Sequence, residues 1–372
     1  MSGRYDWIVV GAGIIGSLTA WRLAQNGFRV ALVDAGAPGQ QATGAAAGIL
    51  SPLAEAGTIG PFTTLMMHSL HRYPDLVLEL TEESGIDIQY HSTGVLQIAK
   101  EDELVRLRQR YAWQESFGAV WVTDMQKLEP SLAEYHAAIY TPKEGQVHPP
   151  LLVQAAVRAA LARNVHAFFG EPVRSLLRDG LQVRGVQLPT QDLWADAGVI
   201  ITAGAWSHLI VDSVSAPLPL SPIRGQILSL KTDHAPFRHI IFHQHSYLVP
   251  KRDGRLIVGA TEDDAGFDSR VTASGITRLA EILQFFRISE PTFYLEKVWA
   301  GLRPKSADGL PILGRWPGQD SLYIATGHYR NGVLLSAITA DIALGWATNK
   351  PAPMDLSPFH PQRFHNTILP KG

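Results

Sequence analysis

A glycine-rich turn near the N-terminus constrains the fold of this chain more than any other feature. The apolar run Trp7–Val10 is followed by Gly11-Ala-Gly13-Ile-Ile-Gly16, and then by Ser17–Asn26, which has apolar residues at helical spacing. A second apolar run, Arg29–Val33, ends at Asp34. This order of strand, turn, helix and strand predicts a Rossmann-like α/β domain that binds a dinucleotide.

Each glycine of this motif has its own expected task. Gly11 permits the tight turn, Gly13 lets the backbone approach a pyrophosphate, and Gly16 lets helix and strand pack closely. The helix N-terminus then directs unpaired N–H groups at the phosphates, while Asp34 accepts hydrogen bonds from a ribose hydroxyl. A glycine-rich turn in an unrelated α/β protein is the alternative. No second GxGxxG occurs, so we expect one dinucleotide, either NAD or FAD.

The composition is that of a folded chain. Hydrophobic residues make up 46% of its 372 residues and charged residues 18%, which excludes a disordered chain, a collagen and a coiled coil. The net charge of −2 gives no support for a nucleic-acid partner. The chain has no cysteine, which excludes disulfides, thiolate metal sites and cofactors bonded to cysteine. Redox chemistry therefore requires a bound cofactor.

Neither end of the chain predicts a membrane segment. The polar residues 1–6 lead directly into the first strand, without the features of a signal peptide. The longest apolar stretch, Val333–Ala347, is interrupted by Thr339 and Asp341 and is shorter than the roughly 18 to 20 residues that span a bilayer. We expect a cytoplasmic protein with no membrane span.

The remaining chain alternates between helical and strand-like segments. We expect helices at 101–117 and 149–164, and strands at 92–99, 165–169, 198–201, 221–230, 246–250 and 255–260, with a hairpin turn at Lys251–Gly254. The expected fold class is α/β, with a Rossmann-like dinucleotide-binding domain of residues 1–88, 145–220 and 300–350. A substrate domain of residues 89–144 and 221–299, with an antiparallel sheet and helices, is inserted into it. Residues 351–372 are expected to form a C-terminal extension along the surface.

The C-terminal third repeats the order of strand, glycine loop and helix. The strand Leu322–Thr326 leads into Gly327-His-Tyr-Arg-Asn-Gly332 and then into an apolar helix. A helix N-terminus at the pyrimidine end of a flavin stabilises negative charge on the reduced ring. NAD needs no such second anchor, so this segment favours FAD.

These motifs together resemble the D-amino-acid-oxidase superfamily of FAD oxidoreductases, and within it the glycine oxidases of thiamine biosynthesis. The resemblance covers residues 6 to about 347, and its most specific part is 243–250 together with 254–261. It rests also on the Gly11–Gly16 fingerprint, Thr43–Gly48, Gly301–Pro304, Asp308–Pro311 and Gly327–Gly332.

The resemblance implies a set of residues around a non-covalent FAD. Non-covalent binding is expected because the chain has no cysteine and Ala45 stands where histidine-linked members have histidine. The implied cofactor residues are Gly11, Gly13, Ile14, Ile15, Gly16, Asp34, Ala35, Thr43, Ala46, Ala47, Gly48, Ile49, Val173, His328, Tyr329, Arg330, Asn331, Gly332, Val333 and Leu334.

The resemblance also places the substrate between Tyr247, Arg303 and Arg330. A carboxylate taken out of water needs a charged partner, and the planar guanidinium of Arg303 binds it through two hydrogen bonds. Tyr247 and His245 are expected on one face of one strand, where Tyr247 donates to the carboxylate and His245 shapes the wall. The alternatives are a surface salt bridge for Arg303, a loop-stabilising role for Arg330, and structural roles for Tyr247 and His245.

Two further points concern metals and departures from the family. His243 and His245 are expected to face the same way, but no third ligand is evident, so no metal site is expected. Asp34 stands where the family more often has glutamate, and Glu262 stands where glycine oxidases are expected to have an apolar residue. A carboxylate at 262 leaves the side-chain preference of the enzyme open.

The activity implied by the resemblance is FAD-dependent oxidative deamination of glycine, and of sarcosine or small D-amino acids. The products are an imine or 2-oxo acid, ammonia or an amine, and hydrogen peroxide, and the imine is available for the thiazole of thiamine. No side chain is expected to act as a catalytic acid or base. The alternatives are an FAD-dependent D-amino-acid dehydrogenase that passes electrons to a quinone, a nucleic-acid-directed flavoprotein, and a non-catalytic flavin-binding protein. Expected partners are a small amino acid, O₂ and further copies of the chain, with a tetramer as one option.

Overall fold

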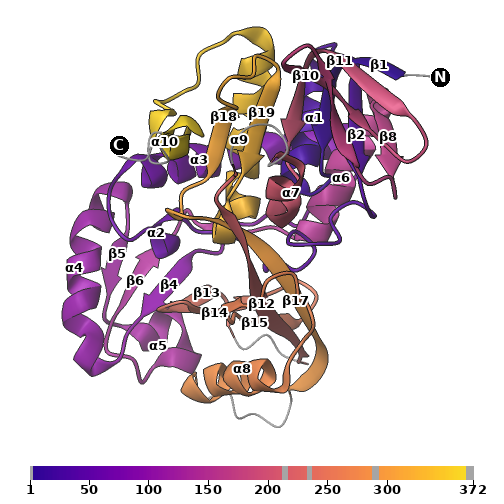
Figure 1. Ribbon diagram of the computed structural model, residues 1–372. Coiled ribbons are helices and arrows are strands. Elements are labelled where there is room, and N and C mark those ends of the chain that lie inside the picture. Colours follow the sequence, from indigo (N-terminus) through magenta and orange to yellow (C-terminus); the bar gives the residue numbers. More distant parts are fainter. Residues whose placement is uncertain (1–2, 212–216, 233–236, 287–292, 366–372) are drawn as a thin grey trace, which may run out of the picture.

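The computed structural model describes residues 3–211, 217–232, 237–286 and 293–365. Within these ranges the chain builds two large sheets in two regions of the molecule, each with its own helices (Figure 1). The predicted α/β fold with a Rossmann-like sheet and a second sheet is confirmed.

The first sheet has a parallel centre. Its order is β18–β19–β11–β1–β2–β8, with β10 and then β9 joined to β11. The pairs from β19 to β8 are parallel, whereas β18, β10 and β9 run antiparallel to their neighbours. The bounds are β1 Gly3–Val10, β2 Val30–Asp34, β8 His166–Phe169, β9 Ser175–Asp179, β10 Gln182–Gln187, β11 Asp192–Ile201, β18 Ile312–Arg315 and β19 Leu322–Thr326.

Alternate side chains of β1 enter two different cores, because neighbouring residues of a strand point to opposite faces. Trp7 and Val9 pack against the helices, whereas Ile8 and Val10 pack on the opposite face. The helices in the first core are α1 Ile14–Gln25, α3 Pro61–Ser84, α6 Pro149–Ala162 and α9 Gly332–Thr348. Helix α1 contacts both α6 and α9, which explains why eleven of its twelve residues are buried.

The second sheet is antiparallel except where β13 lies parallel to β4. Its order is β16–β12–β15–β14–β13–β4–β6–β5, with β17 also paired to β12. The bounds are β4 Val95–Ile98, β5 Val120–Val122, β6 Ala138–Thr141, β12 Leu220–Lys231, β13 Ile240–His243, β14 Ser246–Pro250, β15 Arg255–Gly259, β16 Asp263–Asp264 and β17 Tyr294–Ser306. The long strands β12 and β17 extend from this sheet toward the first region (Figure 1).

Shorter elements complete the fold. A two-stranded sheet pairs β3 Ile49–Leu50 with β7 Gly145–Gln146. The remaining α-helices are α2 Pro52–Glu55, α4 Leu104–Gln114, α5 Met125–Leu128, α7 Ser207–Val211, α8 Ala273–Phe285 and α10 Gln362–His365. Turns of 3-10 helix lie at Glu101–Glu103, Glu115–Phe117, Pro130–Leu132, Gly204–Trp206, Tyr329–Asn331 and Ser357–Phe359.

The segment after Lys350 is anchored rather than merely laid along the surface. Phe359 is fully buried in the first core, and Arg363 pairs with Asp308 at 2.7 Å. This segment also contains the short helix α10, which the sequence does not predict because the apolar residues that anchor the segment form no periodic pattern. No helix within the described ranges is both long and apolar enough to cross a bilayer.

Candidate active site

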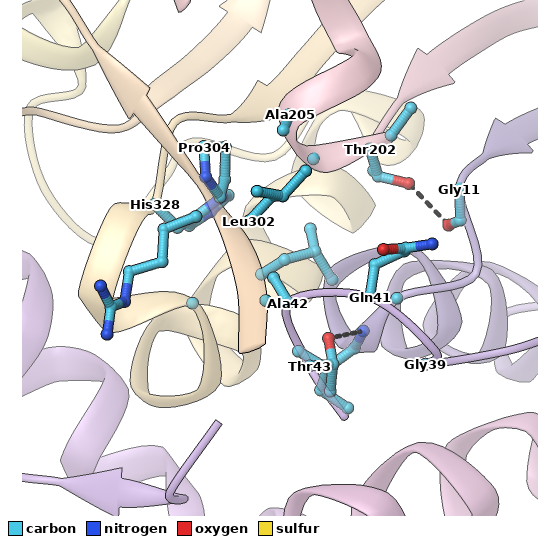
Figure 2. Close-up of a pocket in the computed structure, with 18 of the residues that line it drawn as sticks. Gly11, Gly39, Gln41, Ala42, Thr43, Thr202, Ala205, Leu302, Pro304 and His328 are labelled. Carbon is cyan, nitrogen blue, oxygen red and sulfur yellow. Dashed lines mark hydrogen bonds between the residues drawn. The ribbon is translucent and has the colours of Figure 1, made fainter. Parts of the chain in front are cut away.

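A cavity of about 540 Å³ lies between the two sheets. One end is formed by the carboxyl ends of β1 and β2, and the other by Tyr247 of β14 and residues 301–304 of β17. Figure 2 shows this arrangement, with Gly11 and Thr202 facing Leu302 and Pro304 across the cavity. The cavity thus connects the predicted dinucleotide turn to the predicted substrate residues.

The N-terminus of α1 opens into this cavity, and its N-cap residue has no side chain that could accept from the helix amides. Its N-cap is Gly13, and the amide of Ile14 donates to the Thr43 hydroxyl at 3.1 Å (Figure 2). Amide donors at a helix start are the groups that bind phosphate oxygens. The loop that carries Thr43 therefore covers the helix end where a pyrophosphate is expected.

Asp34 holds the turn together at the end of β2. Its carboxylate accepts hydrogen bonds from the amides of Ala12 at 2.6 Å and Gly36 at 2.8 Å. Burial raises the pKa of Asp34, although these two amides oppose the shift. A carboxylate has about four acceptor positions, so two remain for ribose hydroxyls.

Two glycines of the fingerprint are required by close contacts. Gly11 has a φ of +108°, and a Cβ there would lie 2.6 Å from the Thr202 carbonyl oxygen. A Cβ at Gly16 would lie 1.8 Å from the Gly11 carbonyl oxygen. Gly16 therefore permits packing, as its spacing predicts, and does not line the cavity itself.

The other expected cofactor residues line the cavity, with one more exception. Leu334 is 1% exposed and packs in the first core. Further lining residues that the sequence does not identify include 36–37, 39–42, Glu55, Pro172, 202–206 and Gly301. The turn at 204–206 follows the expected strand 198–201, and its glycine is the sequence signal that could have identified it.

At the other end, two glycines make room for the expected substrate residues. A Cβ at Gly259 would lie 2.6 Å from the Tyr247 ring, and one at Gly225 would lie 2.3 Å from the Arg303 guanidinium. Tyr247 is 7% exposed, and burial raises the pKa of its hydroxyl although Arg303 opposes the shift. The hydroxyl therefore stays protonated and able to donate.

Arg303 is a cation without a carboxylate partner among the described residues. Its Nη1 donates to the Thr261 carbonyl oxygen at 3.0 Å, and its side chain lines the cavity. The alternative of a surface salt bridge therefore does not describe it. A half-buried guanidinium in this position is suited to an anionic ligand.

Arg330, by contrast, is already paired. Its Nε and Nη2 donate to the two carboxylate oxygens of Glu55 at 2.9 and 3.0 Å, and its Nη1 donates to Glu262 at 2.9 Å. The two partners come from α2 and from the segment after β15. Arg330 lines the cavity, but this structure favours the loop-stabilising alternative over direct substrate binding.

His245 does not lie on the strand with Tyr247. The hairpin turn between β13 and β14 consists of Gln244 and His245, and Gln244 has a φ of +52°. The side chain of His245 is exposed and does not line the cavity, while its carbonyl oxygen accepts from Arg330 at 3.2 Å. The expected face shared by His243, His245 and Tyr247 is therefore wrong. Among the described residues, no group of three or more His, Asp or Glu side chains is arranged to hold a metal ion.

Comparison with known proteins identifies the family. Residues 6–346 match the DAO family, described as FAD dependent oxidoreductase. The chain belongs to this family. It is similar to glycine oxidase of Bacillus subtilis, with 31% identity over 95% of this chain and 96% of that protein. Glycine oxidase of Geobacillus kaustophilus is 33% identical over 96% and 97% of the two chains. A crystal structure of glycine oxidase from that organism superposes with a TM-score of 0.90 at 32% identity, covering 96% of this chain and 98% of the other.

This FAD-dependent amino acid oxidase has a cavity whose residues fit the cofactor. The start of α1 at Gly13, the Asp34 acceptor and the left-handed Gly11 meet the needs of the pyrophosphate and ribose. Near β17, a Cβ at Gly301 would lie 2.5 Å from the Cβ of Ala45, so the cavity loop approaches the strand closely. Ala45 offers no atom for a covalent link.

The loop before α9 contains a neutral histidine. Burial lowers the pKa of His328 to about 3, and its Nε2 lies 3.0 Å from the Thr339 hydroxyl. Burial and the charge of Glu262 raise the pKa of Tyr329 to about 12. Neither side chain changes protonation near neutral pH.

Proposed function

We propose that the chain oxidises glycine, and sarcosine or small D-amino acids, to the corresponding imine with O₂ as the electron acceptor. The observation that carries the proposal is Arg303, which forms no ion pair within the described residues and lies beside the Tyr247 hydroxyl at the end of the FAD cavity. The glycine oxidases among its relatives support glycine as the substrate. FAD, when bound, supplies the acceptor for hydride from the α-carbon.

The residues of this chain bind and orient the substrate. Arg303 takes the carboxylate and Tyr247 donates to it, which fixes the direction of the α C–H bond. The apolar wall formed by Leu302 and Pro304 excludes water from this end of the cavity. Released imine then hydrolyses to a 2-oxo acid and ammonia or amine, while O₂ is reduced to hydrogen peroxide.

We further propose that the imine serves thiazole formation in thiamine synthesis. The chain is 31% identical to the bifunctional protein ThiO/ThiG of Trichormus variabilis over 96% of its own length and 55% of that protein. Relatives of this bifunctional kind support this use of the product.

An anaerobic experiment tests the proposed function. The purified yellow protein is mixed with glycine, sarcosine or D-alanine, and the flavin absorbance is followed before air is readmitted. Rapid bleaching by glycine, with peroxide formed on reoxygenation, is the expected result. Bleaching without peroxide in air would favour the dehydrogenase that uses a quinone, and a protein bleached by none of the three would overturn the substrate.

Tyr247→Phe is expected to lower kcat/KM for glycine about tenfold, because one hydrogen bond to a charged ligand is worth roughly 1.5 kcal/mol. Most of the effect should appear in KM, and steady-state peroxide production measures it. Tyr5→Phe, which removes a hydroxyl that contacts His166 in β8, is the matched control and should leave both constants unchanged. Equal KM values for Tyr247→Phe and the unaltered protein would remove Tyr247 from the binding site.

The activity should rise with pH through the titration of the substrate amine, because the neutral amine lone pair is needed to release hydride. The Tyr247 and Tyr329 hydroxyls have raised pKa values and His328 has a pKa of about 3, so these groups add no inflection between about pH 6 and pH 9. A pH profile of kcat/KM measures this. A profile that is flat over that range would contradict the requirement for a neutral amine.

A further inference from the structure

The substrate end of the cavity contains two cations and two carboxylates. Arg303 and Arg330 line the cavity together with Glu55, and Glu262 reaches Arg330 from outside it. Their formal charges therefore sum to zero before a substrate enters. One substrate carboxylate brings the group to a charge of −1, and a second would bring it to −2.

Arg330 has little capacity left for a second carboxylate. Four of its five N–H groups donate to Glu55, Glu262 and the carbonyl oxygen of His245, and its side chain is 8% exposed. Burial lowers the pKa of Arg330, but Glu55 and Glu262 raise it by more than burial lowers it, so the net shift is upward. Arg330 remains charged, and its charge is already paired with the two glutamates.

Glu55 is fixed by a buried network behind α2. Arg110 donates to the carbonyl oxygens of Leu53, Ala54 and Ala56. On the other side, Glu144 accepts from the Leu53 amide at 2.6 Å. Because its helix is held from both sides, Glu55 keeps its two-point contact with Arg330.

Glu262 is the adjustable member of this group. It makes one contact to Arg330 at 2.9 Å, and its side chain is 39% exposed, compared with 14% for Glu55. It directly follows Thr261, whose carbonyl oxygen accepts from Arg303. Burial raises the pKa of Glu262, but Arg330 lowers it by more than burial raises it, so the carboxylate is ionised at neutral pH.

We infer that this chain is selective for amino acids with a single carboxylate, and that Glu262 determines the selectivity by placing a second negative charge on Arg330, whose own charge Glu55 already balances. The inference rests on the proposed function, in which Arg303 binds the first carboxylate. A second carboxylate meets the glutamates in a cavity with apolar walls, where like charges repel more strongly than in water. Iminodiacetate, which carries two carboxylates, is therefore a poor substrate for this chain. An iminodiacetate oxidase from Chelativorans has a similar structure, with 25% identity and a TM-score of 0.86.

Binding of acetate and malonate to the oxidised holoenzyme tests this inference without turnover. Both ligands are fully ionised at about pH 8, and perturbation of the flavin absorbance gives each dissociation constant. The unaltered protein should bind acetate more tightly than malonate. In Glu262→Gln, the ratio of the malonate constant to the acetate constant should fall about tenfold, because one repelling charge has been removed.

Two control variants isolate the pairing with Arg330. Glu262→Asp retains the charge and should retain the unaltered ratio. Glu281→Gln makes the same charge change on α8. The Glu281 side chain is exposed and lines a second, smaller cavity that Glu262 also lines, but it does not contact Arg330, so the ratio should again be unaltered. The ratio of kcat/KM for glycine to that for iminodiacetate should follow the same order.

The outcomes separate this inference from the proposed function. If acetate does not bind and glycine does not bleach the flavin, the anion site at Arg303 is wrong and the proposed function fails. If acetate binds and the ratio is the same in Glu262→Gln as in the unaltered protein, the selectivity is wrong. An equal fall in Glu281→Gln would overturn the assignment to Glu262.

Discussion

Replacement of Arg303 by alanine is expected to lower kcat/KM for glycine about a thousandfold while the purified protein stays yellow. Removing one member of a buried, hydrogen-bonded charge pair costs about 4 kcal/mol, which corresponds to this factor. The residues that hold the nucleotide, from Gly11 to Asp34, belong to the opposite end of the cavity, so FAD content should not change. Anaerobic flavin reduction and the ratio of FAD to protein measure the two effects separately.

Two further variants show whether the loss belongs to the guanidinium at 303. Arg303→Lys retains the charge but not the planar pair of donors, so it should recover only part of the activity. Arg4→Ala removes an arginine from a surface ion pair with Asp196, where the Arg4 side chain is 74% exposed, and should have no effect on turnover. If the kcat/KM of Arg303→Ala for glycine were within tenfold of that of the unaltered protein, the substrate carboxylate would bind elsewhere.

The nucleotide end of the cavity was predictable because its requirements are local in sequence. The strand, the three glycines and Asp34 occupy residues 7–34, and Gly11 and Gly16 are required by close contacts with Thr202 and within the turn itself. Only Gly16 and Leu334 of the expected cofactor residues do not line the cavity. The loop at 36–42 was missed, since lining by small and polar residues leaves no periodic signal.

The substrate end was less predictable because its paired charges come from residues that lie far apart in the sequence. Glu55 and Arg330 are separated by 275 positions in the chain, and no local pattern connects them. Sequence reasoning placed Arg330 correctly beside the cavity but could not show that its donors are occupied. Arg303 was easier to interpret, since its apolar and glycine-bearing neighbours already argued against a surface position.

The position of His245 shows the limit of strand periodicity. The alternation rule holds only while both residues belong to the strand, and the hairpin places His245 one residue before β14. Gln244 adopts the left-handed conformation without being glycine or asparagine, so the turn lacks its usual sequence signal.

Gly225→Ala is expected to reduce kcat/KM for glycine about a hundredfold without removing FAD. Gly225 lies in β12 opposite Gly301 of β17, and its added methyl group would lie 2.3 Å from Cζ of Arg303. The guanidinium is the movable end of its side chain, so it shifts while the strands stay paired. A displacement of about 1 Å at a positioning group is enough for a loss of this size. Steady-state kinetics and thermal unfolding measure activity and stability independently.

A double-mutant cycle decides whether this loss acts through Arg303. Two changes that disturb the same contact are not additive, so Gly225→Ala in the Arg303→Ala background should cause little additional loss. Gly57→Ala is the matched control, because a Cβ at Gly57 meets no atom within 4 Å and should leave kcat/KM unchanged. If the two losses multiply in the double variant, Gly225 acts on the site by another route. Non-additive losses would show that the glycine serves to hold the guanidinium in place for the substrate carboxylate.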